Sequence, residues 1–256
     1  MSHLEDYGRR FANIEFERRD GVLLVRLHTN GGPLKWGALD GSIHSQLGEA
    51  FYQIARDLEN RVVILTGTGD AFCDAMNYAE LPAEPLAQIW PRLQREGQDL
   101  LMQLLDIPVP VIGAINGPAL IHAELLVLSD IVLASSHAEI SDQAHFVHGV
   151  VPADGVQIVW PMLVGHNRAR HFLLTGERMT AQRAWELGVV GEVVTQEALL
   201  DRACEIARSL AAKPIETLRY TRAVFAQPFK RRMADELGYG LALEGIAGIA
   251  AQSGKT

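Results

Sequence analysis

Two short runs of apolar residues constrain the fold of this 256-residue chain more than any other feature. They are GVLLVRL at 21–27 and RVVILTG at 61–67, and both are rich in β-branched residues with little alternation of polar and apolar positions. Such runs are typical of strands that are buried on both faces. The segment between them, residues 42–58, has apolar residues at helical spacing. The sequence therefore predicts a strand–helix–strand unit with parallel strands.

The same order repeats along the first two thirds of the chain, with strands at 109–115 and 130–135 and a helix around 86–105. A further helix is expected directly after Gly117 and Pro118, because proline is favoured in the first turn of a helix. Strands that alternate with helices predict an α/β fold with a parallel sheet and right-handed crossovers.

From about residue 155 the sequence favours helices almost throughout. Four segments there carry helical patterns: 181–188, 196–213, 214–227 and 229–252. We therefore divide the chain into an α/β core at 1–195 and a helical C-terminal region at 196–256. We expect this region to pack on the core or on a neighbouring subunit.

The charge and composition exclude several classes of partner. The formal net charge is −8 and the Lys and Arg residues are scattered, whereas nucleic acids and anionic membranes are bound by basic surfaces. No apolar run is long enough to span a bilayer, and the first residues, MSHLEDYGRR, lack the apolar core of a signal peptide. Cys73 and Cys204 are the only cysteines. We expect a cytoplasmic protein with both thiols reduced.

The segment HFVHGVVPAD at 145–154 carries the first candidate catalytic pair, His145 and Asp154. A carboxylate that accepts a hydrogen bond from one imidazole nitrogen fixes the tautomer and leaves the other nitrogen to take a proton from water. The sequence therefore favours His145 as a general base that Asp154 orients. The alternative is a hydrogen-bonded histidine and a turn aspartate without a catalytic role.

His122 and Glu244 are the next candidates. His122 follows the expected helix start, where backbone N–H groups and the imidazole would stabilise a carbonyl oxygen that gains negative charge. Glu244 is the only charged residue between Glu236 and Lys255, so it lies on an apolar helix face and needs a partner or a function. The alternatives are a core histidine and a wetted position at a subunit edge.

Metal and nucleotide binding have no motif in this chain. The nine histidines form no HExxH pattern, the two cysteines form no CxxC, and His122, His145 and His148 have no recognised ligand spacing. No glycine stretch after a strand completes a GxGxxG or a phosphate-binding loop. We therefore expect neither a metal ion nor an organic cofactor.

Five separated segments, taken in order, resemble the crotonase superfamily of enoyl-CoA hydratases and isomerases. They are VVILTGTGDAFCDAMNY, PVIGAINGPAL, LSDIVLASSHAEIS, HGVVPADG and LLTGERMTAQRAWELGVVGEVV. The resemblance implies a spiral of ββα and βαβ turns, a helical C-terminal trimerisation region, and two backbone N–H groups that hold an enolate. It places those donors near Asp74, Ala75 and Ile121 of this chain, where the substrate would bind.

The chain departs from the hydratase pattern at the expected catalytic positions. Asp74 and Ala75 stand where a small residue and a glycine are usual, and ALIHAE replaces a glycine run. Glu124 falls at the position of one hydratase glutamate, but His145 occupies the position of the other. These features resemble the branch of the superfamily that hydrolyses carbon–carbon bonds of β-diketones such as 6-oxocamphor.

This resemblance implies a retro-Claisen hydrolysis of a cyclic β-diketone to a keto acid, without a cofactor. The catalytic residues it implies are His145, Asp154, His122 and Glu244. Other residues are expected around the substrate: Trp36 and His44 in the pocket, and Leu81, Trp90, Phe146 and Trp160 as walls. A homotrimer, or a hexamer built from two trimers, is also implied. The alternatives are a CoA-thioester hydratase or isomerase, and a catalytically inactive scaffold of the same fold.

Overall fold

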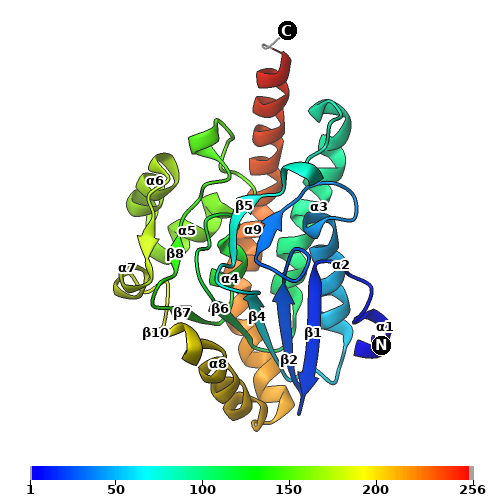
Figure 1. Ribbon diagram of the computed structural model, residues 1–256, viewed down its shortest axis with the longest axis vertical. Coiled ribbons are helices and arrows are strands. Elements are labelled where there is room, and N and C mark those ends of the chain that lie inside the picture. The colour runs from blue at the N-terminus through cyan, green and yellow to red at the C-terminus, as the bar shows by residue number, and fades with distance from the viewer. Residues whose placement is uncertain (1, 254–256) are drawn as a thin grey trace.

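The structure, a computed structural model, describes residues 2–253, which form a six-stranded sheet with helices on both faces (Figure 1). In spatial order the strands are β1 (Ile14–Arg19), β2 (Val22–Leu27), β4 (Val62–Gly67), β6 (Val111–Ile115), β7 (Ile131–Ser135) and β10 (Glu192–Val194). The strands from β2 to β10 are parallel, so the predicted parallel α/β sheet is confirmed.

Strand β1 is the exception, because it pairs with β2 in the antiparallel direction. Asp20 and Gly21 connect the two strands, and both have positive φ, 51° and 79°. Two residues in this conformation form the tight turn that suits the twist of a hairpin. An Asp-Gly pair before an apolar run is the sequence signal for such a hairpin, although the prediction above does not include it.

The other elements cover the sheet or connect its strands. The helices are α1 (Leu4–Tyr7), α2 (Ile43–Arg56), α3 (Leu86–Asp106), α4 (Glu124–Val127), α5 (Val156–Val164), α6 (His166–Thr175), α7 (Ala181–Glu186), α8 (Gln196–Ala211) and α9 (Ile215–Ser253). The short strands and turns are β3 (Leu34–Trp36), β5 (Cys73–Met76), β8 (Glu139–Ile140), β9 (Met179–Thr180), η1 (Tyr78–Glu80) and η2 (Phe146–His148). The domain boundary at residue 195 stays a prediction.

Alternate residues of the parallel strands reach two separate hydrophobic layers. On one face Val22 and Leu24 pack in a cluster with Leu199 of α8. On the other face Leu23 and Val25 join the main core, to which α2 and α3 contribute. Burial on both faces explains why these strands appear in the sequence as nearly continuous apolar runs.

The stretch after β6 corrects one prediction, because no helix starts at Gly117 and Pro118. Ala119 instead bridges Cys73 of β5 and Ile140 of β8, and it continues the small sheet that these strands form. Extended pairing holds this stretch out of the helical conformation, so helix α4 begins only at Glu124 and is four residues long.

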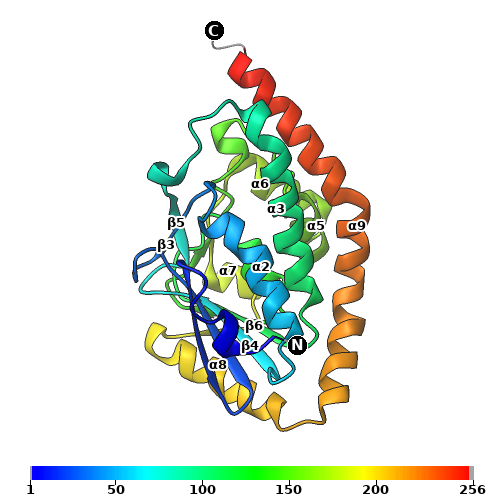
Figure 2. The same cartoon turned by 90° about the vertical axis from the view of Figure 1, so that its right-hand side faces the viewer.

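Helix α9 corrects a second prediction, since the segments predicted at 214–227 and 229–252 form one helix of 39 residues, which begins at Ile215 and continues through Pro228. Proline removes one backbone hydrogen bond and usually kinks or ends a helix. Here Ala226 and Met233 are buried on either side of it, so packing holds both halves of the helix in place. Figure 2 shows α9 running beside α3 along the length of the molecule, and the two helices are in contact.

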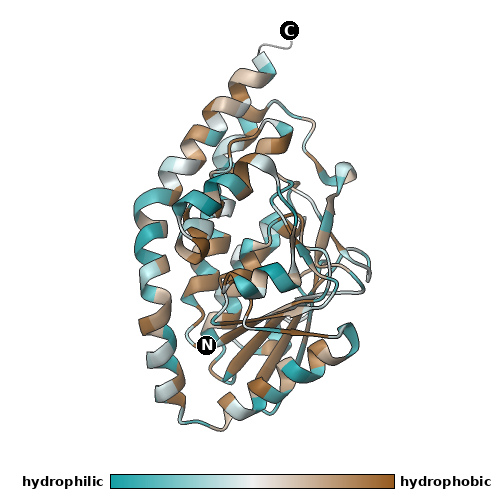
Figure 3. Ribbon diagram, turned by 90° about the vertical axis from the view of Figure 1, so that its left-hand side faces the viewer, coloured by the Kyte–Doolittle hydropathy of each residue, from teal (hydrophilic) through white to brown (hydrophobic). Residues whose placement is uncertain are grey.

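Hydrophobic residues concentrate in the strands of the sheet, which are largely brown in Figure 3. The helices carry hydrophilic residues along much of their length. Within residues 2–253, none of the helices combines the length and the apolar character that crossing a membrane would require.

The contact between α9 and α3 depends on a glycine at position 245. A Cβ atom at Gly245 would overlap the indole ring of Trp90 on α3. Gly245 is buried, and Glu244 precedes it directly. The small residue therefore lets α9 come close enough to α3 for Glu244 to reach the interior.

We expect Gly245→Ala to lower the free energy of unfolding by about 1–3 kcal/mol, because the rigid indole has no room for the added methyl group. The matched control is Gly97→Ala, which lies in the same helix–helix contact but whose Cβ would come no closer than 3.7 Å to Leu241. It should be neutral or stabilise by up to about 1 kcal/mol through helix propensity. Urea unfolding measures both, and equal stability of the two variants would contradict the close approach.

Candidate active site

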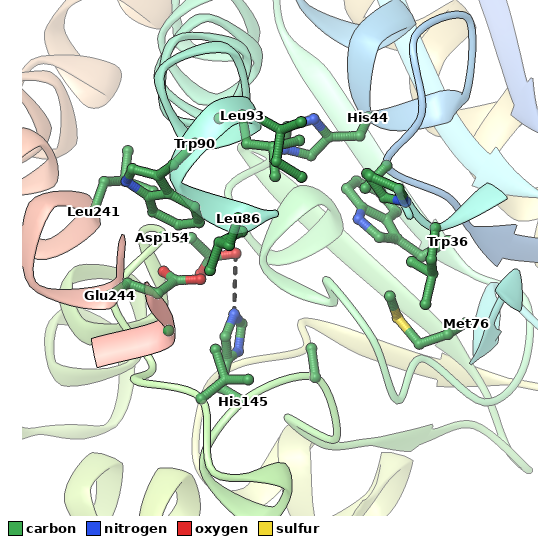
Figure 4. A pocket seen from close by; sticks show the side chains of 18 of the residues that line it. Trp36, His44, Met76, Leu86, Trp90, Leu93, His145, Asp154, Leu241 and Glu244 are labelled. Carbon is green, nitrogen blue, oxygen red and sulfur yellow. Dashed lines mark ion pairs between the residues drawn. The ribbon is translucent and has the colours of Figure 1, made fainter. Parts of the chain in front are cut away.

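A cavity of about 370 Å³ lies between α3, α9 and the loops that follow the strands (Figure 4). The structure brings six of the nine predicted catalytic and substrate-binding residues to its wall: Trp36, His44, His122, His145, Asp154 and Glu244. Most of the remaining wall is apolar and includes Leu86, Leu93, Leu100 and Leu241. Polar groups on one side and apolar side chains on the others are typical of a small-molecule site.

Two glycines shape the loop that carries His145 and Asp154. Gly149, with φ of 77°, ends the short helix η2, and Gly155, with φ of 121°, precedes α5. Both conformations favour glycine, since side chains with a Cβ rarely adopt them. The loop therefore turns back on itself, and the two side chains meet although they are nine positions apart in the sequence.

His145 lies between two carboxylates. Its Nδ1 is 2.6 Å from Oδ1 of Asp142, and its Nε2 is 3.2 Å from Oδ2 of Asp154. The expected contact between His145 and Asp154 is present, but the expectation that the other nitrogen is available to water is wrong. Asp142, which the sequence analysis missed, occupies it. The signal for Asp142 was a carboxylate three residues before a histidine in the same loop.

These contacts make His145 and Asp154 an ion pair. Burial alone would lower the pKa of His145, but Asp154 and Asp142 together raise it well above the ordinary value of a histidine. Burial would also raise the pKa of Asp154, but the imidazoles of His145 and His122 hold it below its usual range. At neutral pH His145 is therefore an imidazolium without an electron pair to accept a proton from water.

His122 is held in a strained and well-defined position. Its φ is 52°, a left-handed conformation that costs roughly 1–2 kcal/mol for a residue with a Cβ. Its Nδ1 lies 2.7 Å from Oε1 of Glu124, and its ring stacks on Trp36 with centroids 3.8 Å apart. Burial lowers the pKa of His122, but Glu124 outweighs this effect and raises it. With Nδ1 engaged, Nε2–H is the donor that remains.

Glu124 therefore has a structural explanation. It is buried at the start of α4, and burial raises its pKa even though His122 opposes that shift. Its contact with Nδ1 fixes the orientation of the His122 ring, as carboxylates commonly do for functional imidazoles.

Glu244 enters the cavity from α9 and points toward Asp154 and His145 in Figure 4. Its Oε2 is buried and has no hydrogen-bond partner among the described residues. Burial and the charge of Asp154 raise the pKa of Glu244 to about 8. A carboxyl group of this kind exchanges a proton near neutral pH, as a general acid or base requires.

Three predicted substrate-binding residues lie outside the cavity wall. Asp74 is exposed, Ala75 pairs with Lys35 in the small sheet, and Ile121 is buried behind the wall. The N–H of Ile121 donates to the carbonyl oxygen of Cys73, so it is not an available donor for an oxyanion. The N–H groups of Leu120 and Ile121 both donate to the carbonyl oxygen of Cys73, which is the physical reason for this correction.

Of the four predicted wall residues, two line the cavity and two do not. Leu81 and Trp90 line the cavity. Phe146 does not, since its side chain is 48% exposed, and Trp160 does not, since it packs inside the core against Phe172 at a ring-centroid distance of 4.5 Å. An aromatic residue near a site in the sequence is therefore a weak guide to the wall of its cavity.

The donor atoms of His122, Glu124 and Asp154 lie within 4.8 Å of one another, a spacing that could hold a metal ion. Nδ1 of His122 already faces both carboxylates, at 2.7 Å from Glu124 and 3.5 Å from Asp154. Hydrogen bonding and ion pairing among the three groups therefore account for the cluster. The absence of a metal from the site stays a prediction.

Residues 17–242 match the family described as enoyl-CoA hydratase/isomerase. The 1,2-epoxyphenylacetyl-CoA isomerase of Escherichia coli K12 is 32% identical over 198 residues, which cover 76% of this chain and 74% of that protein. A carnitinyl-CoA dehydratase from Citrobacter koseri is 32% identical over 203 residues, covering 77% and 74%.

Two solved structures extend this comparison. A β-diketone hydrolase from the cyanobacterium Anabaena sp. PCC 7120, bound to (S)-3-oxocyclohexyl acetic acid, is 45% identical with a TM-score of 0.92 and covers 96% of this chain and 98% of its own. An enoyl-CoA hydratase/isomerase from Mycobacterium paratuberculosis is 26% identical with a TM-score of 0.83, covering 93% and 94%.

The raised pKa of Glu244 predicts a pH-dependent effect of Glu244→Gln on stability. The folded chain keeps a proton on Glu244 up to a pH of about 8, whereas the unfolded chain releases it near the ordinary value of 4.5, so this group makes folding less favourable as pH rises through that window. Glutamine does not ionise, so the Glu244→Gln variant does not lose stability in this pH window. We expect the melting temperature of Glu244→Gln, relative to wild type, to be about 5 °C higher at pH 9 than at pH 6.

The control for this measurement is Asp235→Asn, on the exposed face of the same helix. Its melting temperature relative to wild type should change little between the two pH values. If Glu244→Gln behaves like Asp235→Asn, Glu244 is ionised in the folded protein at neutral pH.

Proposed function

This chain belongs to the enoyl-CoA hydratase/isomerase family, and from that premise we propose that it hydrolyses a carbon–carbon bond of a cyclic β-diketone. One observation carries the proposal: a single cavity contains a carboxyl group with a pKa of about 8, at Glu244, and an imidazole N–H donor, at His122. The first can activate water, and the second can stabilise the oxyanion that forms when hydroxide adds to a ketone.

The similar β-diketone hydrolase supports this choice of substrate through the molecule bound to it. That molecule carries a ring ketone and an acetic acid side chain. Addition of water across one carbon–carbon bond of a bicyclic β-diketone produces these two groups. We extend this substrate class to the present chain, and we include 6-oxocamphor among the bicyclic diketones to be tested.

The reaction starts with ionised Glu244, which takes a proton from water while the hydroxide adds to one carbonyl carbon. The tetrahedral adduct collapses to a carboxylic acid and breaks the bond to the carbon between the two carbonyls. The electron pair of that bond becomes the enolate of the second carbonyl. Protonated Glu244 then returns its proton to the enolate carbon, so one water is consumed and the carboxylate of Glu244 is regenerated.

His122 stabilises the adduct through its Nε2–H, since Glu124 occupies Nδ1. An oxyanion donor of this kind typically contributes about 3–4 kcal/mol to transition-state stabilisation. In this proposal a side chain supplies the donor that hydratases take from a backbone N–H. The engaged N–H of Ile121 supports that substitution.

His145 acts through Asp154 instead of acting as the base. Its imidazolium, held by Asp142 from behind, fixes the carboxylate of Asp154 at the cavity. The charge on Asp154 contributes to the raised pKa of Glu244, and a base whose pKa lies near the working pH is the most effective. The base is therefore Glu244 and not His145.

The second candidate function is a CoA-thioester hydratase or isomerase, and the CoA-dependent relatives of the family support it. The cavity argues against it at the catalytic positions, since Glu124 is engaged by His122 and His145 replaces the second glutamate. The two functions differ in whether an acyl-CoA binds.

The test is turnover of two bicyclic diketones, 6-oxocamphor and the dione whose ring opening gives 3-oxocyclohexyl acetic acid. In water labelled with heavy oxygen we expect a keto acid with one labelled oxygen in its carboxyl group. In deuterium oxide we expect one deuterium on the carbon beside the ketone. Turnover of acyl-CoA esters, with no reaction of either diketone, would overturn the proposal.

Variants test the assigned roles in the same assay. Glu244→Gln should lower kcat by roughly 10²- to 10⁴-fold, as expected for loss of a general base. The wild-type kcat/KM should rise with pH through about 8, because Glu244 must be ionised to accept a proton, and this rise should be absent from the variant. His122→Gly removes the imidazole while suiting the positive φ at that position, and it should lower kcat by about 10²- to 10³-fold. A wild-type pH profile in Glu244→Gln would assign the base to another group.

We also propose that the chain assembles as a homotrimer or as a hexamer of two trimers, and we place it in the cytoplasm. Exposed apolar side chains on α9 support an assembly: Tyr220, Val224, Phe225, Tyr239, Leu243 and Ile246. Clusters of this kind are typical of protein interfaces. Light scattering after size-exclusion chromatography should give three or six times the mass of one chain, and a monomer at micromolar concentration would contradict the assembly.

A further inference from the structure

The proposed reaction makes an acid inside a cavity that is poor in cations. Among residues 2–253, the side chains that line the cavity include no lysine or arginine. They include four carboxyl groups, those of Glu84, Glu124, Asp154 and Glu244. Proteins commonly bind a carboxylate through an arginine, which donates two parallel hydrogen bonds. The keto acid product therefore has to be held by other donors.

The imidazoles nearest to Glu244 are engaged with carboxylates of the protein itself. His145 has Asp142 at Nδ1, 2.6 Å away, and Asp154 at Nε2, 3.2 Å away, so it has no N–H left for a ligand. Nδ1 of His122 lies 2.7 Å from Glu124. The N–H that remains on His122, at Nε2, already serves the attacked ketone oxygen in the proposed mechanism.

The other two titratable groups of the cavity add no unpaired cation. Nδ1 of His44 lies 2.9 Å from Glu96, a carboxylate that also accepts two hydrogen bonds from Arg92, at 2.9 and 3.0 Å. Neither Glu96 nor Arg92 belongs to the cavity wall. Glu84, in the exposed segment before α3, brings one more carboxyl group to the wall.

The new carboxyl group of the product forms beside Glu244. In the proposed mechanism Glu244 takes a proton from the attacking water, and the oxygen of that water becomes part of the product acid. Oε2 of Glu244 is buried and has no hydrogen-bond partner among the described residues, and the side chain points toward Asp154 in Figure 4. The product acid therefore starts within hydrogen-bond reach of Glu244.

The chemistry leaves a single proton for these two carboxyl groups. Collapse of the adduct gives a neutral carboxylic acid, and return of a proton to the enolate carbon leaves Glu244 ionised. Two adjacent carboxylates repel each other, whereas a carboxylic acid donates a short and strong hydrogen bond to a carboxylate. Asp154, fixed as a carboxylate by His145, increases the repulsion that a second negative charge would meet.

Resting on the proposed function, we propose that Glu244 recognises the keto acid product through one shared proton and that the product is expelled when this proton is lost to water. The cavity then accepts two classes of ligand: neutral ketones, and carboxylic acids that bind together with a proton. Without the proton, the product carboxylate meets the carboxylates of Glu244 and Asp154. Inhibition by the product is therefore strongest at low pH and fades as pH rises.

The experiment is calorimetric titration of the protein with 3-oxocyclohexyl acetic acid and with its carboxamide, at pH 7 and pH 9. The acid is ionised in solution at both values, whereas Glu244 loses its proton near pH 8. We expect the acid to bind about 10-fold more weakly at pH 9 than at pH 7. At pH 9 its binding should take up close to one proton, measured from the heats in two buffers of different ionisation enthalpy. The affinity of the neutral carboxamide should change less than about threefold.

Two matched variants identify the group that shares the proton. Glu244→Gln keeps a hydrogen-bond donor at the site but cannot titrate, so the pH dependence and the proton uptake should both disappear. Glu84→Gln removes the exposed carboxyl group of the same cavity by the same chemical change, and it should retain both effects.

The proposal is overturned if the wild-type affinity for the acid is equal at the two pH values, or if no acid binds at millimolar concentration. A pH dependence that survives in Glu244→Gln or disappears in Glu84→Gln would also contradict it. If Glu244→Gln does not fold, wild-type binding at pH 9 without proton uptake decides against the proposal. A wild-type protein that binds the acid with proton uptake but hydrolyses neither diketone would refute the proposed function and still support recognition of the acid by Glu244.

Discussion

The buried ion pair between His145 and Asp154 is the interaction on which the site depends. Moving two opposite charges away from water is costly unless further hydrogen bonds support them, and Asp142 provides that support from behind His145. The pair places a fixed negative charge at the cavity, beside a carboxyl group that has no partner of its own among the described residues. The charge of Asp154 adds to the burial that raises the pKa of Glu244.

Each side chain with a proposed catalytic role has a neighbouring group that fixes its position. Carboxylates hold the three imidazoles, Trp36 stacks against His122, and Gly245 lets α9 approach α3. Groups that are fixed before the substrate arrives need no reorganisation during the reaction, which is the main advantage of a folded site over free acids and bases in water. The strained backbone of His122 is likewise held in place by the folded structure before a substrate arrives.

The parallel sheet could be predicted because burial on both faces leaves a continuous apolar signature, as in 61–67. The uninterrupted helix across Pro228 could not, since packing against distant residues overrides the local preference of proline. The same reason applies to residues 117–123, where pairing with β5 and β8 replaces the expected helix.

Of the candidate site, the residues that reach the cavity could be predicted, but their supporting partners could not. His145 and Asp154 share one short loop, so their meeting depends on local geometry alone. His44 and Glu96 are separated by 52 positions and meet only because α2 packs on α3. Asp142 is local, but a single carboxylate near a histidine is too common a pattern to identify a partner. The contact of Ile121 with Cys73 likewise depends on strand pairing that the local sequence does not indicate.

Glu244 lies close to the C-terminal end of the last helix, while the other groups with a proposed catalytic role and the carboxylates that support them come from residues 122–154. A ribosome therefore finishes the sheet and both histidine loops well before it supplies the carboxyl group that completes them. In the proposed mechanism, the imidazoles and aspartates of these loops cannot activate water until α9 has docked. Docking of α9 therefore brings the proposed base to the groups that position it.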